Sequence, residues 1–139
     1  MKHVDNTFDI KRLTKDRVPA LPFLRMKEAA LGKTYELSLV ITSDKLSQEL
    51  NTTYRNKTYT PNVLSFPIDK KHGEIFLNLK QARREHNDRE ESYEYFVALL
   101  FIHGCLHLKG MPHGSTMEKQ EARLLKKFAI ENTYRKEKK

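Results

Sequence analysis

Three histidines lie close together near the C-terminal end of the chain, in the segment 103–113. His103 and His107 are four residues apart, so on a helix both imidazoles point to the same side. Gly110 can adopt a left-handed conformation that ends the helix and returns the chain, which would bring His113 to the same point. Three neutral imidazoles that converge form a tridentate site for zinc or a similar divalent ion, with a fourth position open. The spacing therefore predicts a catalytic metal site at a helix end.

The residue that follows the first histidine limits the chemistry of this site. Zinc proteases with the pattern HExxHxxGxxH carry a glutamate there, which acts as the general base for the metal-bound water. In this chain the position is Gly104. The pattern therefore favours a metal hydrolase that activates its nucleophile in another way, and it argues against a peptidase.

The remaining candidate ligands do not share this spacing. His3, His72 and His86 have no other potential ligand at a spacing typical of metal sites, so we interpret them as surface or loop residues. Cys105 is the single cysteine and lies on the opposite side of the helix from the histidines. We expect it to be a small buried residue rather than a ligand or a nucleophile.

Length and charge restrict the class of protein. A chain of 139 residues with 38% apolar and 32% charged residues fits a single domain, 1–139, with a core of its own. The formal net charge of +8 favours a polyanionic partner such as RNA, DNA or an acidic membrane surface. The lysine-rich tail at 136–139 contributes to this charge, but the rest of the chain is basic as well.

Cysteine content and hydropathy bear on the location of the protein. With one cysteine, no disulfide can form within the chain, which fits a reducing compartment. No run of 18 apolar residues and no N-terminal secretory signal is present, so we expect a cytoplasmic protein without a membrane span.

The elements that must position the histidines can be read from periodicity and from helix-capping residues. We expect a helix over 18–31, a strand over 35–41 and a helix that begins at Ser43 or Asp44 and continues to about residue 54. Two further strands, 62–66 and 74–79, flank a turn and predict a hairpin.

The best helix covers 91–109, with Phe96, Leu100, His103 and His107 along one stripe. A capping box at 115–118 predicts a last helix that extends through Phe128. Strands and helices mix without strict alternation. We therefore expect an α+β fold, with a small mixed sheet of about four strands packed against about five helices.

A second polar constellation precedes the hairpin. Arg55 and Lys57 lie where a helix ends and a polar loop begins. The planar guanidinium of an arginine can donate two hydrogen bonds at once to phosphate oxygens, so Arg55 is a candidate phosphate ligand. Alternatively, an arginine at a helix C-terminus only complements the helix dipole or lies in solvent.

Together the two segments resemble the YbeY family of bacterial rRNA-maturation endoribonucleases. The two signatures of that family are LNxxYRxxxxxTDVLSFP and HGxLHLxGxDH. They are similar to residues 50–67 and 103–113 of this chain, in the same order, with the sequence Gly-Glu-Ile at 73–75 between them. The resemblance covers most of the chain.

The resemblance implies roles for four residues. His103, His107 and His113 would be the ligands of one zinc ion, and Arg55 would be the active-site arginine. The implied activity is that of a zinc-dependent, single-strand-specific endoribonuclease in small-subunit rRNA maturation and ribosome quality control. The implied partners are RNA, in particular small-subunit rRNA, and ribosomal proteins of the small subunit.

Two positions depart from the family pattern. The aspartate before the third histidine is replaced by Pro112, and the Thr-Asp pair before the strand is replaced by Pro61 and Asn62. Both changes remove a carboxylate that could orient a ligand imidazole or transfer protons. The chain would be either a divergent active enzyme or a weakened one that mainly binds RNA.

The leading hypothesis is metal-assisted cleavage of single-stranded RNA, with Arg55 stabilising charge on the phosphate. Lys57, Arg83 and Arg84 are candidates for holding the RNA backbone. No general base is apparent, so attack by water and attack by the 2′-hydroxyl both stay open. One alternative is a ribosome- or RNA-binding factor with a structural zinc and little or no catalysis. The other is a metal hydrolase for another substrate.

Overall fold

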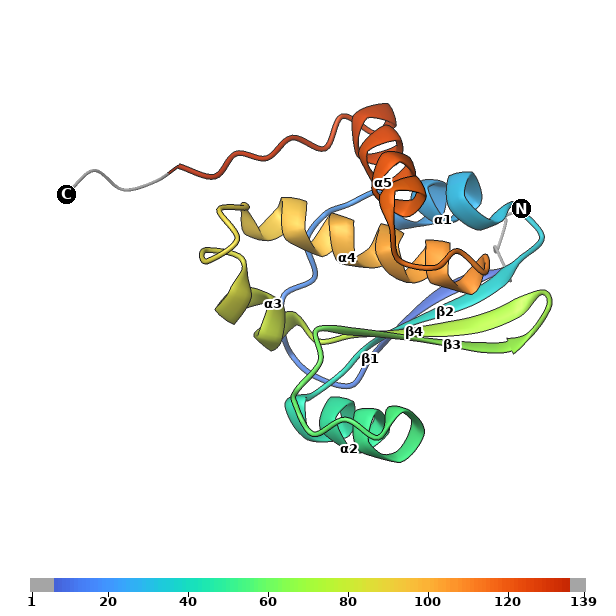
Figure 1. Ribbon diagram of the computed structural model, residues 1–139, viewed down its shortest axis with the longest axis vertical. Coiled ribbons are helices and arrows are strands. Elements are labelled where there is room, and N and C mark those ends of the chain that lie inside the picture. The colour runs from blue at the N-terminus through green and yellow to red at the C-terminus, as the bar shows by residue number, and fades with distance from the viewer. Residues whose placement is uncertain (1–6, 136–139) are drawn as a thin grey trace, which may run out of the picture.

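A computed structural model describes residues 7–135, which form one mixed β-sheet covered by helices (Figure 1). His3 and the lysine-rich tail lie outside the described residues. The strands are β1 (Phe8–Arg12), β2 (Glu36–Ile41), β3 (Val63–Asp69) and β4 (His72–Leu77). The helices are α1 (Phe23–Leu31), α2 (Asp44–Arg55), α3 (Leu79–Glu85), α4 (Tyr93–Leu108) and α5 (Ser115–Lys127). The expected α+β class is confirmed.

The sheet has the order β1-β2-β4-β3. Strands β1, β2 and β4 are parallel, and β3 pairs antiparallel with β4 as the expected hairpin. Pro67 is tolerated because β3 is an edge strand, where a missing N–H interrupts no ladder on the open side. The hairpin strands extend closer to the turn than predicted, and the register shifts between Pro67 and Asp69.

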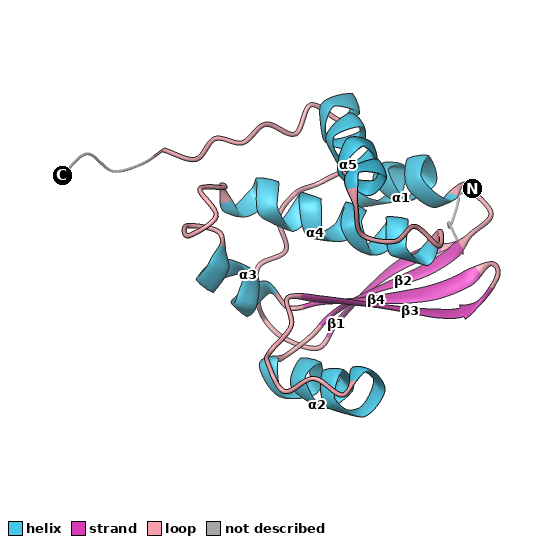
Figure 2. Cartoon of the chain, in the orientation of Figure 1, coloured by secondary structure: helices cyan, strands magenta, loops and turns pink. Residues whose placement is uncertain are grey.

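The helices cover the two faces of the sheet unequally (Figures 1 and 2). Helices α1, α3, α4 and α5 lie on one face, and α2 packs on the other, next to β3. The main core lies between the sheet and α4, where alternate residues of β2 and β4 such as Leu39, Ile41 and Ile75 are fully buried. This layer fixes α4, and thereby its C-terminal histidines, directly above β3 and β4.

Helix α4 is buried on more sides than the predicted single stripe. Nine of its 16 residues are buried, because α1 and α5 cover the side that faces away from the sheet. A helix enclosed in this way is apolar all round, so its sequence shows little amphipathic periodicity. Along the part of the chain from 7 to 135, no helix has both the length and the apolar character needed to cross a bilayer.

Several predicted boundaries are confirmed and others are wrong. Ser43 caps α2 by accepting a hydrogen bond from the Leu46 N–H. The capping box at 115–118 is wrong, because Ser115 is already the first helical residue and the N-cap is Gly114 without a side-chain bond. Strand β1 was not predicted, and α3 begins at Leu79, which the sequence assigned to the preceding strand.

Candidate metal and active site

The turn after α4 brings the third histidine back to the helix. Gly110 has a left-handed φ of 97°. Its N–H donates to the His107 carbonyl, and the Met111 N–H donates to the Leu106 carbonyl. These two bonds are those of a Schellman motif, in which a left-handed residue ends the helix and reverses the chain. The predicted role of Gly110 is therefore confirmed.

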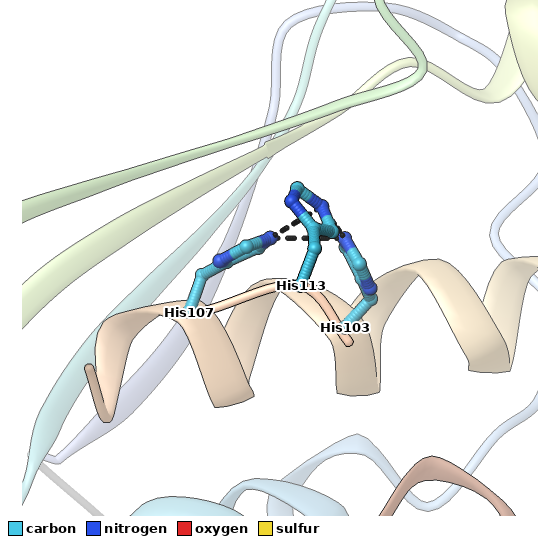
Figure 3. Close-up of side chains that lie close together, drawn as sticks. All are labelled: His103, His107 and His113. Carbon is cyan, nitrogen blue, oxygen red and sulfur yellow. Dashed lines mark hydrogen bonds between the residues drawn. The ribbon is translucent and has the colours of Figure 1, made fainter. Parts of the chain in front are cut away.

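The three imidazoles point toward one another above the end of α4 (Figure 3). The Nε2 atoms of His103 and His107 are 3.0 Å apart, those of His107 and His113 are 3.0 Å apart, and those of His103 and His113 are 3.1 Å apart. Side chains separated by up to ten residues in the sequence thus present the same atom to one point. The three residues could hold a metal ion.

The chemistry of this donor set fits a cation. A neutral imidazole has one N–H, and that of His103 faces a carboxylate through Nδ1, so its Nε2 offers a lone pair. If the rings of His107 and His113 present Nε2 lone pairs as well, the three lone pairs would repel one another without a cation. Tetrahedral zinc with bonds of about 2.0–2.1 Å would hold its ligand nitrogens about 3.3 Å apart, close to the spacing found here.

His107 is partly buried, and His113 is more exposed. Partial burial lowers the pKa of the His107 imidazole, and the neighbouring His103 and His113 lower it further. Both effects favour the neutral ring, which is the form that binds a metal.

A carboxylate from another helix touches the triad from behind. Glu121 on α5 lies with Oε2 at 2.5 Å from Nδ1 of His103, and its side chain is only 12% exposed. Sequence reasoning missed this residue because it lies 18 positions beyond His103 on a separate helix. Its helical neighbours give no local signal that it faces a histidine.

Arg55 is the last residue of α2, and it lines the same hollow as the three histidines. Its Nη1 donates to Oδ1 of Asn51 at 3.3 Å, and the Asn51 amide donates to the Tyr59 carbonyl at 2.9 Å. Asn51 is fully buried, so it anchors both the arginine and the loop that follows. Arg55 itself is exposed.

The histidine cleft is the hollow that contains the triad and Arg55, with a volume of about 830 Å³. Its walls come from the loop 59–62, strand β3, residues 85 and 89, the inner side of α4 and the start of α5. Asn62, which stands where the family pattern has aspartate, donates its amide to Glu85 at 2.7 Å. A carboxylate is therefore present in this wall, one hydrogen bond away from the expected position.

The three residues predicted to hold RNA lie outside the lining of the histidine cleft. Arg84 forms two hydrogen bonds with the carboxylate of Asp44, and the guanidinium of Arg83 lies 4.2 Å from the ring centroid of Tyr93. Lys57 is exposed in the loop just after α2. The cleft instead contains Arg89, which is bound to Glu91 and lies 4.7 Å from the Phe96 ring centroid. The RNA contacts of Lys57, Arg83 and Arg84 stay predictions.

Arg84 also changes the titration of its partner. The Arg84 guanidinium and the Asn78 amide lower the pKa of Asp44 to about 2. This ion pair ties α3 to the first residue of α2, so Arg84 has a structural contact whether or not it meets RNA.

The other sulfur and imidazole groups occupy structural positions. Cys105 is fully buried, and burial raises the pKa of its thiol far above the ordinary value, as expected for an unreactive core residue. His72 lies in the β3–β4 hairpin beside Asp69 and Glu36, and Nδ1 of His86 contacts the Glu91 carbonyl.

Comparison with known proteins identifies similar chains over most of this length. A family model described as Endoribonuclease YbeY matches residues 2–133. A protein named Endoribonuclease YbeY from Ehrlichia ruminantium (strain Welgevonden) is 39% identical over 108 residues, which cover 70% of this chain and 69% of the relative. A protein of the same name from Onion yellows phytoplasma is 33% identical over 119 residues, which cover 79% and 78% of the two chains.

A solved structure has the same fold. The solution structure of TM1509 from Thermotoga maritima superimposes with a TM-score of 0.61, covers 86% of this chain and 89% of its own, and is 20% identical. At this identity the likeness concerns the arrangement of the sheet and helices, and this agreement supports the architecture described above.

Proposed function

Because the chain belongs to the YbeY endoribonuclease family, we propose that it cleaves phosphodiester bonds in single-stranded RNA with the help of one metal ion. The observation that carries the proposal is the shared cleft. The triad of histidine Nε2 atoms and Arg55 line the same hollow. A phosphate that enters the cleft would meet both groups.

His103, His107 and His113 would hold the ion, and we propose zinc because three neutral imidazoles suit it. When bound, the ion supplies Lewis acidity toward a phosphoryl oxygen or a water molecule. The three histidines line an open cleft, and three protein ligands with a further position for water or substrate are typical of a catalytic zinc site, which supports this proposal.

Arg55 would bind the phosphate and stabilise the negative charge that develops there during cleavage. Its hydrogen bond with Asn51 uses one Nη atom and leaves the other donors for phosphate oxygens. Arg89 lines another wall of the cleft and is the additional cation that could hold the RNA backbone there. Lys57, Arg83 and Arg84 would guide more distant parts of the strand.

The biological substrate that we propose is small-subunit rRNA during its maturation and during ribosome quality control. The net charge of +8 supports a polyanionic substrate. Small-subunit ribosomal proteins are the proposed partners, and the cytoplasm is the proposed location.

The test compares cleavage of a labelled single-stranded RNA by the parent protein, two test variants and two control variants. The zinc content of each preparation is measured first. His107→Ala is expected to abolish cleavage and zinc binding together. Arg55→Ala is expected to abolish cleavage while zinc stays bound at one ion per chain. His72→Ala in the distant hairpin and Arg123→Ala on α5 remove the same side-chain types away from the cleft, and they should cleave as the parent does.

Two results would contradict the proposal. Full cleavage by His107→Ala would show that the triad is not part of the active site. Zinc bound by the parent, with cleavage no higher than that of His107→Ala, would show a binding factor with a structural zinc, in which the changes at Pro112 and Asn62 have removed catalysis.

A further inference from the structure

Helix α5 contributes one side chain to the histidine cluster. The carboxylate of Glu121 lies 2.5 Å from Nδ1 of His103, behind the ring and away from the other two histidines. The glutamate is 12% exposed and the histidine 25% exposed, so water screens the contact little. A hydrogen bond at this distance to a charged acceptor is at the strong end of the range.

This contact determines which nitrogen of His103 carries the proton. A carboxylate accepts hydrogen bonds, so Nδ1 must donate, and in the neutral ring the proton is then absent from Nε2. Nε2 is the atom that faces His107 and His113. The glutamate therefore selects the tautomer in which the lone pair points to the centre of the triad.

The contact also limits rotation of the ring. Helices α4 and α5 pack against each other, and Met117, Leu124 and Leu125 bury the inner face of α5. Glu121 is carried by this anchored helix, so it holds the imidazole from a fixed position. Between residues 7 and 135, His113 has no hydrogen bond with a carboxylate, and Pro112 precedes it in the sequence.

We propose that Glu121 is the positioning residue of the metal site: it holds His103 in the metal-binding tautomer and increases the affinity for the ion. This inference rests on the proposed function, because it takes the three histidines as ligands of a metal ion. An orienting carboxylate is thus present in this chain, on α5 rather than next to the third histidine. Carboxylates that hold a metal-ligating imidazole in this way typically change metal affinity about 10–100-fold.

The experiment measures zinc affinity by competition with a chromogenic chelator, so that no step depends on RNA cleavage. Glu121→Gln keeps the shape of the side chain and a neutral acceptor, and zinc affinity should fall about 10-fold, the lower end of the range for such contacts. Glu121→Ala removes the acceptor, and the loss should be larger, toward about 100-fold.

The matched control is Glu118→Gln. Glu118 lies one turn earlier on α5 and lines the same cleft, but within residues 7–135 its carboxylate has no hydrogen bond to a histidine. The control removes the same charge at a similar place and should bind zinc as the parent does. An equal loss in Glu118→Gln and Glu121→Gln would overturn the proposal in favour of a general effect of negative charge.

A spectroscopic readout separates positioning from a merely structural role. In the zinc-loaded parent, the Nδ1 proton of His103 should give a downfield resonance that exchanges slowly, because the carboxylate holds it. The resonance should be lost in Glu121→Ala, while thermal unfolding of the metal-free protein shows whether the variant folds. If Glu121→Ala does not fold, the comparison of the two glutamine variants decides the question.

The failure of this inference differs from that of the proposed function. If the parent binds zinc and cleaves RNA but Glu121→Gln and Glu121→Ala bind zinc equally well, only the role of Glu121 is refuted. If the parent binds no zinc at all, the metal-dependent function is refuted, and the role of Glu121 with it.

Discussion

Gly104 takes the place of the glutamate of zinc proteases, and it also lies where α4 packs closely against the sheet. It lies between two histidines of the triad, and a Cβ atom there would stand 3.0 Å from Ser65 Oγ and 3.1 Å from Ile75 Cδ1. The Gly104 carbonyl also accepts a hydrogen bond from that Ser65 hydroxyl at 3.0 Å. Helix α4 thus touches the sheet at this residue. A side chain at the position that holds the base in zinc proteases would therefore press against Ser65 of β3 and Ile75 of β4.

We therefore expect Gly104→Glu to destabilise the protein rather than to create a peptidase. A charged side chain forced between α4 and the sheet is buried without a partner, and the free energy of unfolding should fall by about 3–5 kcal/mol. Urea unfolding followed by circular dichroism measures the change.

Ala122→Glu is the control for this substitution, because it introduces the same side chain at an exposed position of α5 and should leave stability near that of the parent. Equal stability of Gly104→Glu and the parent would mean that the helix and the sheet are less closely packed at this point than the structure places them.

The histidines were predictable from the sequence, and the glutamates around them were not. His103, His107 and Gly110 are neighbours along one helix and its end, so their spacing alone places them in space. Glu85 and Glu121 come from two other helices, and only tertiary packing brings them to the cleft. Arg55 was predictable as a helix-end cation, but its place in the same cleft as the triad depends on how α2 and β3 pack.

At the scale of elements, the end of α2 and its loop form one unit. Asn56 adopts a left-handed conformation with φ of 55°, and the side chain of Asn51 joins the loop at Tyr59 to the guanidinium of Arg55. The arginine is itself exposed, so this buried amide is the anchor that determines where it lies.

Replacing Asn51 with alanine should therefore reduce cleavage without touching the metal site. The free energy of unfolding is expected to fall by about 1–3 kcal/mol, because the Tyr59 carbonyl loses its buried donor. At a temperature where the variant is fully folded, kcat for RNA cleavage should decrease while zinc affinity equals that of the parent.

Thr53→Ala, at an exposed position of the same helix, is the control for helix propensity and should retain parental cleavage. A variant Asn51→Ala that is less stable but cleaves at the parental rate would show that the arginine is positioned by other contacts.

The elements that the sequence predicted best are those with strong local signals. Helix α2 has a serine cap, and strand β2 and the hairpin have alternating or apolar runs between turn residues. Strand β1 was missed because four of its five residues are exposed and its charged residues resemble a loop. Helix α3 was missed because it has only seven residues and begins directly after Asn78, its cap.

At the scale of the whole molecule, the excess of positive charge should govern how RNA associates. The chain carries 26 lysines and arginines against 18 aspartates and glutamates, whereas the cleft itself also contains Glu85, Glu118 and Glu121. Attraction of RNA must therefore come largely from cations around the cleft.

Binding of a non-cleavable 2′-O-methyl RNA should weaken steeply with salt, since each phosphate contact with a single strand contributes a slope of about −0.7 in log K against log salt. Three contacts would reduce affinity more than about tenfold between about 50 and 200 mM KCl. Fluorescence anisotropy measures this. A peptide nucleic acid with the same bases and no charge is the control, and an equally flat response of the RNA would refute an electrostatic mode of binding.

The position of α5 after α4 in the sequence has a consequence for the order in which the parts of the site are made. During synthesis, Arg55 and the three histidines leave the ribosome before Glu121, which follows His103 by 18 residues. A partly made chain would contain the ligands without the helix that orients them, and would hold zinc weakly. The full metal affinity of the site would then arise only after α5 has left the ribosome and has packed against α4.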